Sequence, residues 1–178
     1  MHAARELRCR RHILTMASDK KIPITIKLNG RDVRAQVEPR MLLVEFIREV
    51  AGLTGTHVGC DTSYCGACTV LLDGRAVKSC TALALQAADK AVKTVEGLAS
   101  PDGLSVLQAC FSEQHALQCD FCTPGFLISA TYLLAENADP DERAIRKALG
   151  GNVCRCTGYL PIIQAVQAAA AKMKAPAQ

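Results

Sequence analysis

The chain has 178 residues, 10 of them cysteine, and a formal net charge of +4. This length fits one medium domain or two small ones, and an apolar content of 49% is enough for a core, which excludes a wholly disordered chain. Aromatic residues make up only 4%, so single-stranded nucleic acid would find few stacking platforms. No apolar run approaches the roughly 18 residues of a membrane span, so we expect no transmembrane segment.

The positive charge belongs to the first 21 residues, which hold six basic and two acidic side chains. The rest of the chain has 15 basic and 15 acidic residues and therefore no net charge. A folded region without net charge lacks the basic surface expected of a nucleic-acid-binding protein. We expect residues 1–21 to be a disordered basic leader; a targeting segment, or an extension of a protein that begins near Met16, is the alternative. Without a secretory signal the default location is the cytoplasm, where cysteines seldom form disulfides.

Residues 22–97 have the pattern of a small α+β domain. Asn29-Gly30 and Asp73-Gly74 each separate two short strand-like runs, which predicts two hairpins with type I′ turns. A helix is expected over residues 41–51, with Leu43, Ile47 and Val50 on its buried face and Gly52 as its left-handed stop. A last strand over 91–95 completes a predicted β-grasp, ferredoxin-like sheet.

Residues 98–174 have helical patterns, and residues 175–178 form a short tail. Helices are expected over 105–115, from an N-cap at Thr123 to about 136, from Asp139-Pro140 to Gly150, and from Pro161 to about 174. Short links between four short helices predict an all-α four-helix bundle.

Eight of the cysteines fall into two groups with the spacing of metal ligands. The first group follows the C-x4-C-x2-C spacing of plant-type [2Fe–2S] proteins, with a distant fourth cysteine: Cys60, Cys65, Cys68 and Cys80. Gly59 and Gly66 let this loop bend around a cluster and turn N–H groups toward its sulfurs. Structural zinc is the alternative, although it favours paired knuckles.

The second group lies just before two helix N-termini, which suit an anionic thiolate cluster: Cys119, Cys122, Cys154 and Cys156. Alone it could equally hold zinc, but beside the first group a second iron–sulfur cluster is favoured. Cys9 in the leader and Cys110 on an apolar helical face are expected to be bystanders. For His57, near the first loop, a supporting or surface role is favoured over ligation, and no motif for substrate chemistry appears.

The segments GCDTSYCGACTVLLDGRAVKSC, QCDFCTPG and GGNVCRCTGY resemble the small iron–sulfur subunit of molybdenum hydroxylases, the xanthine dehydrogenase family, with aerobic carbon monoxide dehydrogenase small chains looking closest. The resemblance implies one [2Fe–2S] cluster in each domain. The helical cluster would lie near molybdopterin on a large subunit, and the ferredoxin-like cluster toward FAD on a medium subunit. Gln118 matches a family glutamine that contacts the pterin. Asp120 departs from the glycine usual in the family, and we hypothesise that its charge lowers the potential of the helical cluster.

These observations predict the electron-transfer subunit of a cytoplasmic molybdenum hydroxylase, in a complex expected to be a dimer of heterotrimers. No substrate site and no catalytic residue are expected on this chain. Carbon monoxide is the first expectation for the substrate, with aldehydes or N-heterocyclic aromatics as alternatives. A free-standing two-cluster ferredoxin and a zinc-bound structural or thiol-sensing protein are the competing classes.

Overall fold

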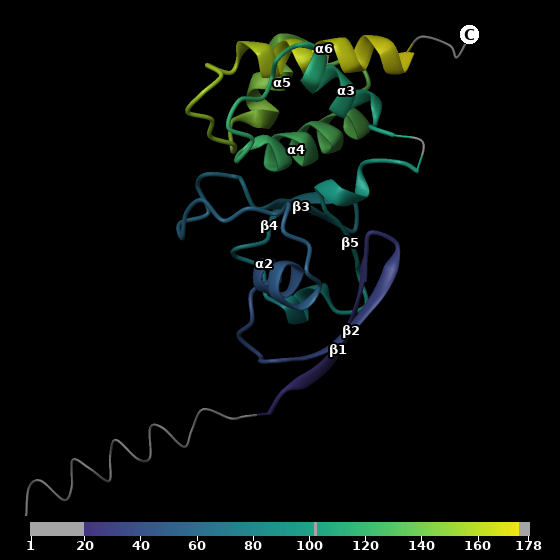
Figure 1. Cartoon of the computed structure of the whole chain (residues 1–178), viewed down its shortest axis with the longest axis vertical. Coiled ribbons are helices and arrows are strands. Elements are labelled where there is room, and N and C mark those ends of the chain that lie inside the picture. Colours follow the sequence, from purple (N-terminus) through teal and green to yellow (C-terminus); the bar gives the residue numbers. More distant parts are fainter. Residues whose placement is uncertain (1–19, 102, 175–178) are drawn as a thin grey trace, which may run out of the picture.

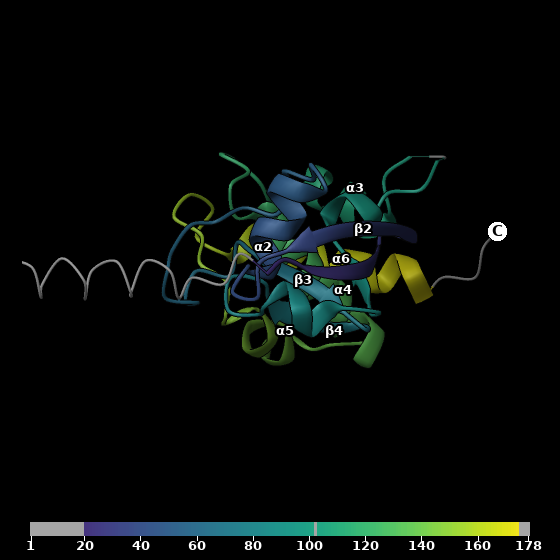
Figure 2. The same ribbon diagram turned by 90° about the horizontal axis from the view of Figure 1, so that it is seen from below.

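The computed structural model describes residues 20–101 and 103–174. The expected tail, and the leader apart from its last two residues, lie outside this part of the chain, as does Cys9. A sheet with its covering helix occupies the N-terminal part, and helices α3 to α6 lie at one end of it (Figure 1). Viewed from the sheet end, these helices lie behind the strands, so the two parts stack along the long axis (Figure 2).

The sheet is mixed and has the order β2-β1-β5-β3-β4 within the described residues. Strands β1 (Ile22–Leu28) and β2 (Arg31–Val37) form one antiparallel hairpin, and β3 (Thr69–Leu72) and β4 (Arg75–Lys78) form the other. Strand β5 (Ala91–Lys93) lies between them, parallel to β1 and antiparallel to β3. The α+β class is therefore confirmed.

Both hairpin turns have the predicted geometry. Asn29 and Gly30 have φ values of 49° and 84°, and Asp73 and Gly74 have φ values of 46° and 81°. A type I′ turn needs positive φ at both central residues, which Asn, Asp and Gly adopt at low cost. These two turns set the strand register on both sides of the sheet.

The helix expected over residues 41–51 is shorter and changes its winding. Helix α2 (Leu43–Glu45) continues as a π-helical turn, η1 (Phe46–Val50), which is closed by a hydrogen bond from Ala51 N to Phe46 O (3.0 Å). The wider turn rotates later side chains off the expected face. Leu43 and Ile47 are buried as predicted, whereas Val50 is 39% exposed and the prediction for it is wrong.

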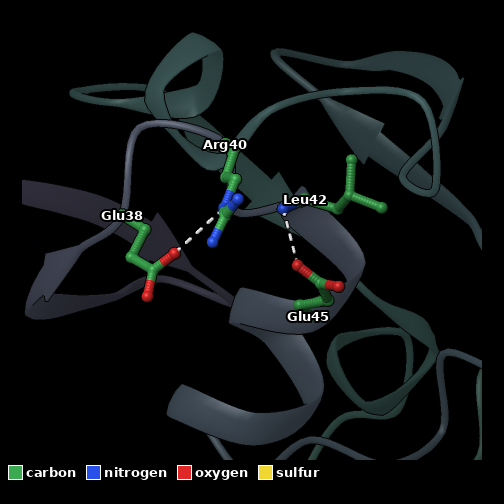
Figure 3. A network of polar contacts seen from close by, with 4 residues as sticks. All are labelled: Glu38, Arg40, Leu42 and Glu45. Atoms are coloured by element: carbon green, nitrogen blue, oxygen red, sulfur yellow. Dashed lines mark hydrogen bonds and ion pairs between the residues drawn. The ribbon is translucent and has the colours of Figure 1, made fainter. Parts of the chain in front are cut away.

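Polar side chains fix the start of α2 (Figure 3). The carboxylate of Glu45 accepts a hydrogen bond from the backbone N–H of Leu42 at 2.9 Å, and Arg40 pairs with Glu38 at 3.2 Å. The Glu45 contact satisfies an amide that has no partner within the helix, and it places the acidic group at the positive end of the helix dipole. These contacts define the point where the chain, after β2, enters helix α2.

The last strand of the sheet ends two residues earlier than predicted. Beyond Lys93, the N–H of Thr94 donates to the side chain of Asn29 in the first hairpin turn at 2.9 Å instead of continuing the ladder. A 3₁₀ turn, η3 (Val95–Gly97), follows directly. Another 3₁₀ turn, η2 (Ala84–Ala87), lies between β4 and β5.

Four helices follow in the described C-terminal part: α3 (Val106–Glu113), α4 (Thr123–Glu136), α5 (Glu142–Leu149) and α6 (Leu160–Lys174). Thr123 is inside α4 and Cys122 occupies the N-cap position, so the predicted Thr123 cap is wrong by one residue. The start at Asp139-Pro140 is also wrong, because Asp141 caps α5 by accepting from Ala144 N at 2.7 Å. None of the helices in the described ranges is long and apolar enough to span a bilayer.

The buried apolar side chains form two separate clusters. One lies between the sheet and α2–η1 and includes Ile26, Phe46 and Val70. The other is shared by helices α3 to α6 and includes Phe126 and Ile162. Helix α4 also packs on strands β3 and β4, so it contacts both parts of the molecule.

Candidate iron–sulfur sites

The first cysteine group lies at one end of the sheet. Cys60, Cys65 and Cys68 come from the loop between η1 and β3, and Cys80 follows β4. The β3–β4 hairpin returns the chain to this loop, since Ser79 Oγ donates to Cys68 O at 2.7 Å. A ligand separated by eleven residues is thus brought beside the other three.

The sulfurs of this group lie as two pairs. The thiols of Cys60 and Cys65 are within hydrogen-bonding reach of each other, and so are those of Cys68 and Cys80. Backbone N–H groups of Cys65 and then Thr62 lower the pKa of Cys60 to about 6, because they stabilise its thiolate. Burial, and then the neighbouring Cys68, raises the pKa of Cys80 to about 11.

The second group has an outer and an inner pair. Cys119 and Cys156 are both exposed and within hydrogen-bonding reach, whereas Cys122 and the buried Cys154 form the inner pair. Burial, and then Cys154, raises the pKa of Cys122 to about 12. Thr157 contacts the Cys154 sulfur through its hydroxyl at 3.1 Å and its N–H at 3.4 Å. The outer pair therefore meets the surface, while the inner pair packs against the core of the helical part.

Two pairs of sulfurs in each group fit two irons better than one ion. No three His, Cys, Asp or Glu side chains are arranged to hold a single metal ion in the ranges 20–101 and 103–174. In a [2Fe–2S] cluster each iron takes two cysteines, and the bridging sulfides keep the two pairs apart. The donor set is all thiolate and carries backbone N–H contacts, as iron–sulfur sites require.

The two cysteine loops contact each other directly. The N–H of Val153, beside Cys154, donates to the carbonyl of Cys65 at 2.9 Å. His57 Nδ1 lies 2.8 Å from the carbonyl oxygen of Phe121, and the two rings stack with centroids 4.7 Å apart. A short path of bonds and one hydrogen bond thus joins one cysteine of each group.

Glycine allows this close approach. Gly66 has φ +77°, and a Cβ atom there would meet Gly151 O and would lie 2.6 Å from Asn152 Nδ2. A Cβ atom on Gly125, in the first turn of α4, would meet Gly66 O. Buried Asn152 bridges the parts by donating to Gly66 O at 3.0 Å and accepting from Ser129 Oγ at 2.8 Å. The loops can be this close only because two facing positions lack side chains.

The structure brings all eight cysteines predicted as ligands into their two groups. Gln118 is exposed next to Cys119, and Cys110 is buried in the helical core, outside both groups. Of the residues that join the two loops, His57 was predicted to lie near the first loop. The sequence did not indicate the other three, Lys78, Asn152 and Val153. The Gly-Gly-Asn sequence before Val153 and Cys154 was the local signal for the second loop, and Lys78 had none.

Comparison with known proteins identifies these groups. Residues 26–99 match the family described as the 2Fe-2S iron-sulfur cluster binding domain, and residues 94–167 match the [2Fe-2S] binding domain. The nicotine 6-hydroxylase small subunit of Paenarthrobacter nicotinovorans is 46% identical over 85% of this chain and 92% of its own length. The aldehyde oxidoreductase iron-sulfur-binding subunit PaoA of Escherichia coli O157:H7 is 38% identical over 86% and 73%.

Among solved structures, quinoline 2-oxidoreductase from Pseudomonas putida 86 matches with a TM-score of 0.83 and 46% identity, over 86% of this chain and 96% of that one. The fold and the paired cysteine groups are those of a two-cluster [2Fe–2S] protein, which excludes the zinc alternative. The chain belongs to the iron–sulfur subunits of the molybdenum hydroxylase family, and it is therefore a subunit of an oxidoreductase complex.

Proposed function

We propose that this chain relays electrons between two partner subunits through its two cluster sites. The observation that carries the proposal is the hydrogen bond from Val153 N to Cys65 O, which connects the two cysteine groups. When bound, each cluster takes up and releases one electron at a time. In this proposal the metal ligands are the two groups already described, with Cys60, Cys65, Cys68 and Cys80 at the sheet and Cys119, Cys122, Cys154 and Cys156 at the helices.

The exposure of the cysteines suggests the direction of the relay. Cys119 and Cys156 are exposed beside Gln118, so this face is suited to a partner that holds molybdopterin, with Gln118 contacting the pterin. The inner pair and Val153 then lead to Cys65. The first cysteine group would face an FAD-binding medium subunit. Cysteine side chains and one backbone hydrogen bond supply the whole path within this chain.

The same proposal covers the organisation of the molecule. Two separate cores support domains at residues 22–97 and 98–174, the second a four-helix bundle. With a large and a medium subunit, the chain would form one half of a dimer of heterotrimers. The eight free cysteines of the two groups support a cytoplasmic complex, because a reducing compartment keeps cysteines from forming disulfides.

The relatives favour an N-heterocyclic aromatic substrate for the complex. Nicotine 6-hydroxylase and quinoline 2-oxidoreductase, both 46% identical to this chain, are named for N-heterocycles, and the 38% identical relative is named for aldehydes. Carbon monoxide has no support among these relatives. The substrate pocket would lie on the large subunit.

Tagged purification from the native host tests the proposal. We expect molybdenum and flavin subunits to copurify, with iron and sulfide near four each per chain and two distinct EPR signals in the reduced protein. A Cys156→Ser variant should lose one EPR signal, whereas Cys110→Ser should keep both because Cys110 lies outside both groups. A chain that elutes alone with two intact signals would instead support a free-standing two-cluster ferredoxin.

A further inference from the structure

The amino group of Lys78, at the end of β4, lies where the two cysteine loops meet. Its Nζ donates to the carbonyl of Gly151 at 2.5 Å and to Thr69 Oγ1 at 3.4 Å. Gly151 lies three residues before Cys154, in the second cysteine loop. A Cβ atom on Gly66 would lie 2.8 Å from the same Nζ. The ammonium group therefore donates to the backbone of the second loop and lies beside Gly66 in the first.

No carboxylate balances this charge among the ion pairs of the described residues. Those pairs are Glu38–Arg40, Glu142–Arg146, Glu113–Lys172 and Asp139–Lys174. The Lys78 side chain is half-buried, and a charge withdrawn from water usually has a partner. Gly66 directly follows the ligand Cys65, and Gly151 precedes the ligand Cys154 by three residues, so the Lys78 charge lies beside segments that carry ligands of both groups.

We infer that Lys78 compensates the negative charge of both cluster sites and thereby raises both midpoint potentials. The inference rests on the proposed function, in that it takes both cysteine groups to hold clusters. Reduction adds one electron to a site with no bond made or broken and no proton required, so the site gains one negative charge. A fixed cation in a partly desolvated position stabilises that added charge.

Redox titration of the holoprotein, followed by EPR at fixed ionic strength, tests this inference. Lys78→Gln removes the charge and keeps an N–H donor on a side chain one atom shorter, so both signals should move to lower midpoint potential. Lys78→Arg keeps the charge and should stay close to wild type. Lys27→Gln removes one exposed positive charge on β1, three strands away from β4, and serves as the matched control.

The inference is overturned if Lys78→Gln leaves the potentials unchanged, shifts them no more than Lys27→Gln, or moves only one signal. Iron content and thermal unfolding are measured for each variant, because a merely structural role would lower these and leave the potentials alone. If Lys78→Gln loads poorly, Lys78→Met, which keeps an unbranched side chain without the charge, replaces it. Failure of the wild-type chain to show two signals would contradict the proposed function instead.

Discussion

Glycine is required at Gly66 for two reasons that can be separated experimentally. Its φ of +77° disfavours any L side chain, and a Cβ atom would meet Gly151 O across the contact between the two cysteine loops. Gly74 has a similar φ of +81° but no atom within 4 Å of an added Cβ. The two glycines therefore form a matched pair.

We expect Gly74→Ala to cost about 1 kcal/mol, the strain of a left-handed residue. Gly66→Ala should cost about 1–3 kcal/mol more, because the backbone cannot yield cheaply to the added methyl group. The temperature at which visible cluster absorption is lost measures both, at about 2–4 °C per kcal/mol. Equal shifts in the two variants would show that the interloop contact is looser than described.

Asp120 is the residue where this chain departs from its family pattern. It has φ +63° and is exposed between Cys119 and Cys122, and a left-handed position of this kind explains why glycine is usual there. Asp tolerates this conformation better than most side chains, so it adds a negative charge at small conformational cost.

We predict that Asp120→Gly and Asp120→Asn both raise the midpoint potential of the helical cluster, since each removes a charge that opposes reduction. The asparagine variant keeps a side chain that accepts positive φ, so it separates charge from backbone strain. EPR redox titration gives the potential of each signal. An unchanged midpoint potential in both variants would mean that the Asp120 carboxylate is too well solvated to affect the cluster.

At the scale of elements, local turn chemistry made the hairpins predictable, whereas helix boundaries and sheet order depended on contacts distant in sequence. Asn29-Gly30 alone sets the first turn, but the side chain of Asn29 also takes the N–H of Thr94 and ends the last strand early. The parallel pairing of β1 with β5 has no local signal. The π turn at Phe46–Val50 likewise has no signature in the apolar spacing.

The cap of α5 gives a prediction at this scale. Asp141 Oδ1 accepts from Ala144 N at 2.7 Å and lies at the positive end of the helix dipole. Asp141→Ala should destabilise the protein by about 1 kcal/mol, and Asp141→Asn should recover most of that loss because asparagine also caps well. Thermal unfolding followed by far-UV circular dichroism measures both. If the two variants are equally destabilised, the negative charge of Asp141 contributes more to stability than its capping hydrogen bond does.

For the whole molecule, the spacing of the cysteines predicted iron–sulfur ligation, whereas the contact between the two cysteine loops emerged only from the fold. Eight cysteines were identifiable because four thiolates must surround a compact cluster, which constrains spacing within each loop. Nothing in either loop indicates that Cys65 O would accept from Val153 N, since that contact depends on how α4 packs against β3. The contact between Cys65 and Val153 is therefore a property of the assembled fold.

Asn152 should decide whether the two parts unfold together. It is 5% exposed and bridges Gly66 O and Ser129 Oγ, and Asn152→Ala would leave the buried hydroxyl of Ser129 without this partner. We expect a loss of about 2–4 kcal/mol, from two lost hydrogen bonds and the Ser129 hydroxyl left unsatisfied, while Gly66 O still accepts from Thr69. Because Asn152 connects the parts, the two EPR signals should disappear together on heating the wild type and at separate temperatures in the variant.

Ser129→Ala is the control for this prediction. It removes the hydroxyl, and with it the donor to Asn152 Oδ1, but keeps the hydrogen bond from Asn152 to Gly66 O. It should therefore cost less, about 1–2 kcal/mol, while both signals still disappear together. Simultaneous loss of both signals in Asn152→Ala would mean that helix α4, packed on β3 and β4, couples the parts without the asparagine. Separate loss in Ser129→Ala as well would mean that the hydroxyl, by orienting the amide, is what holds the two cluster sites in one cooperative unit.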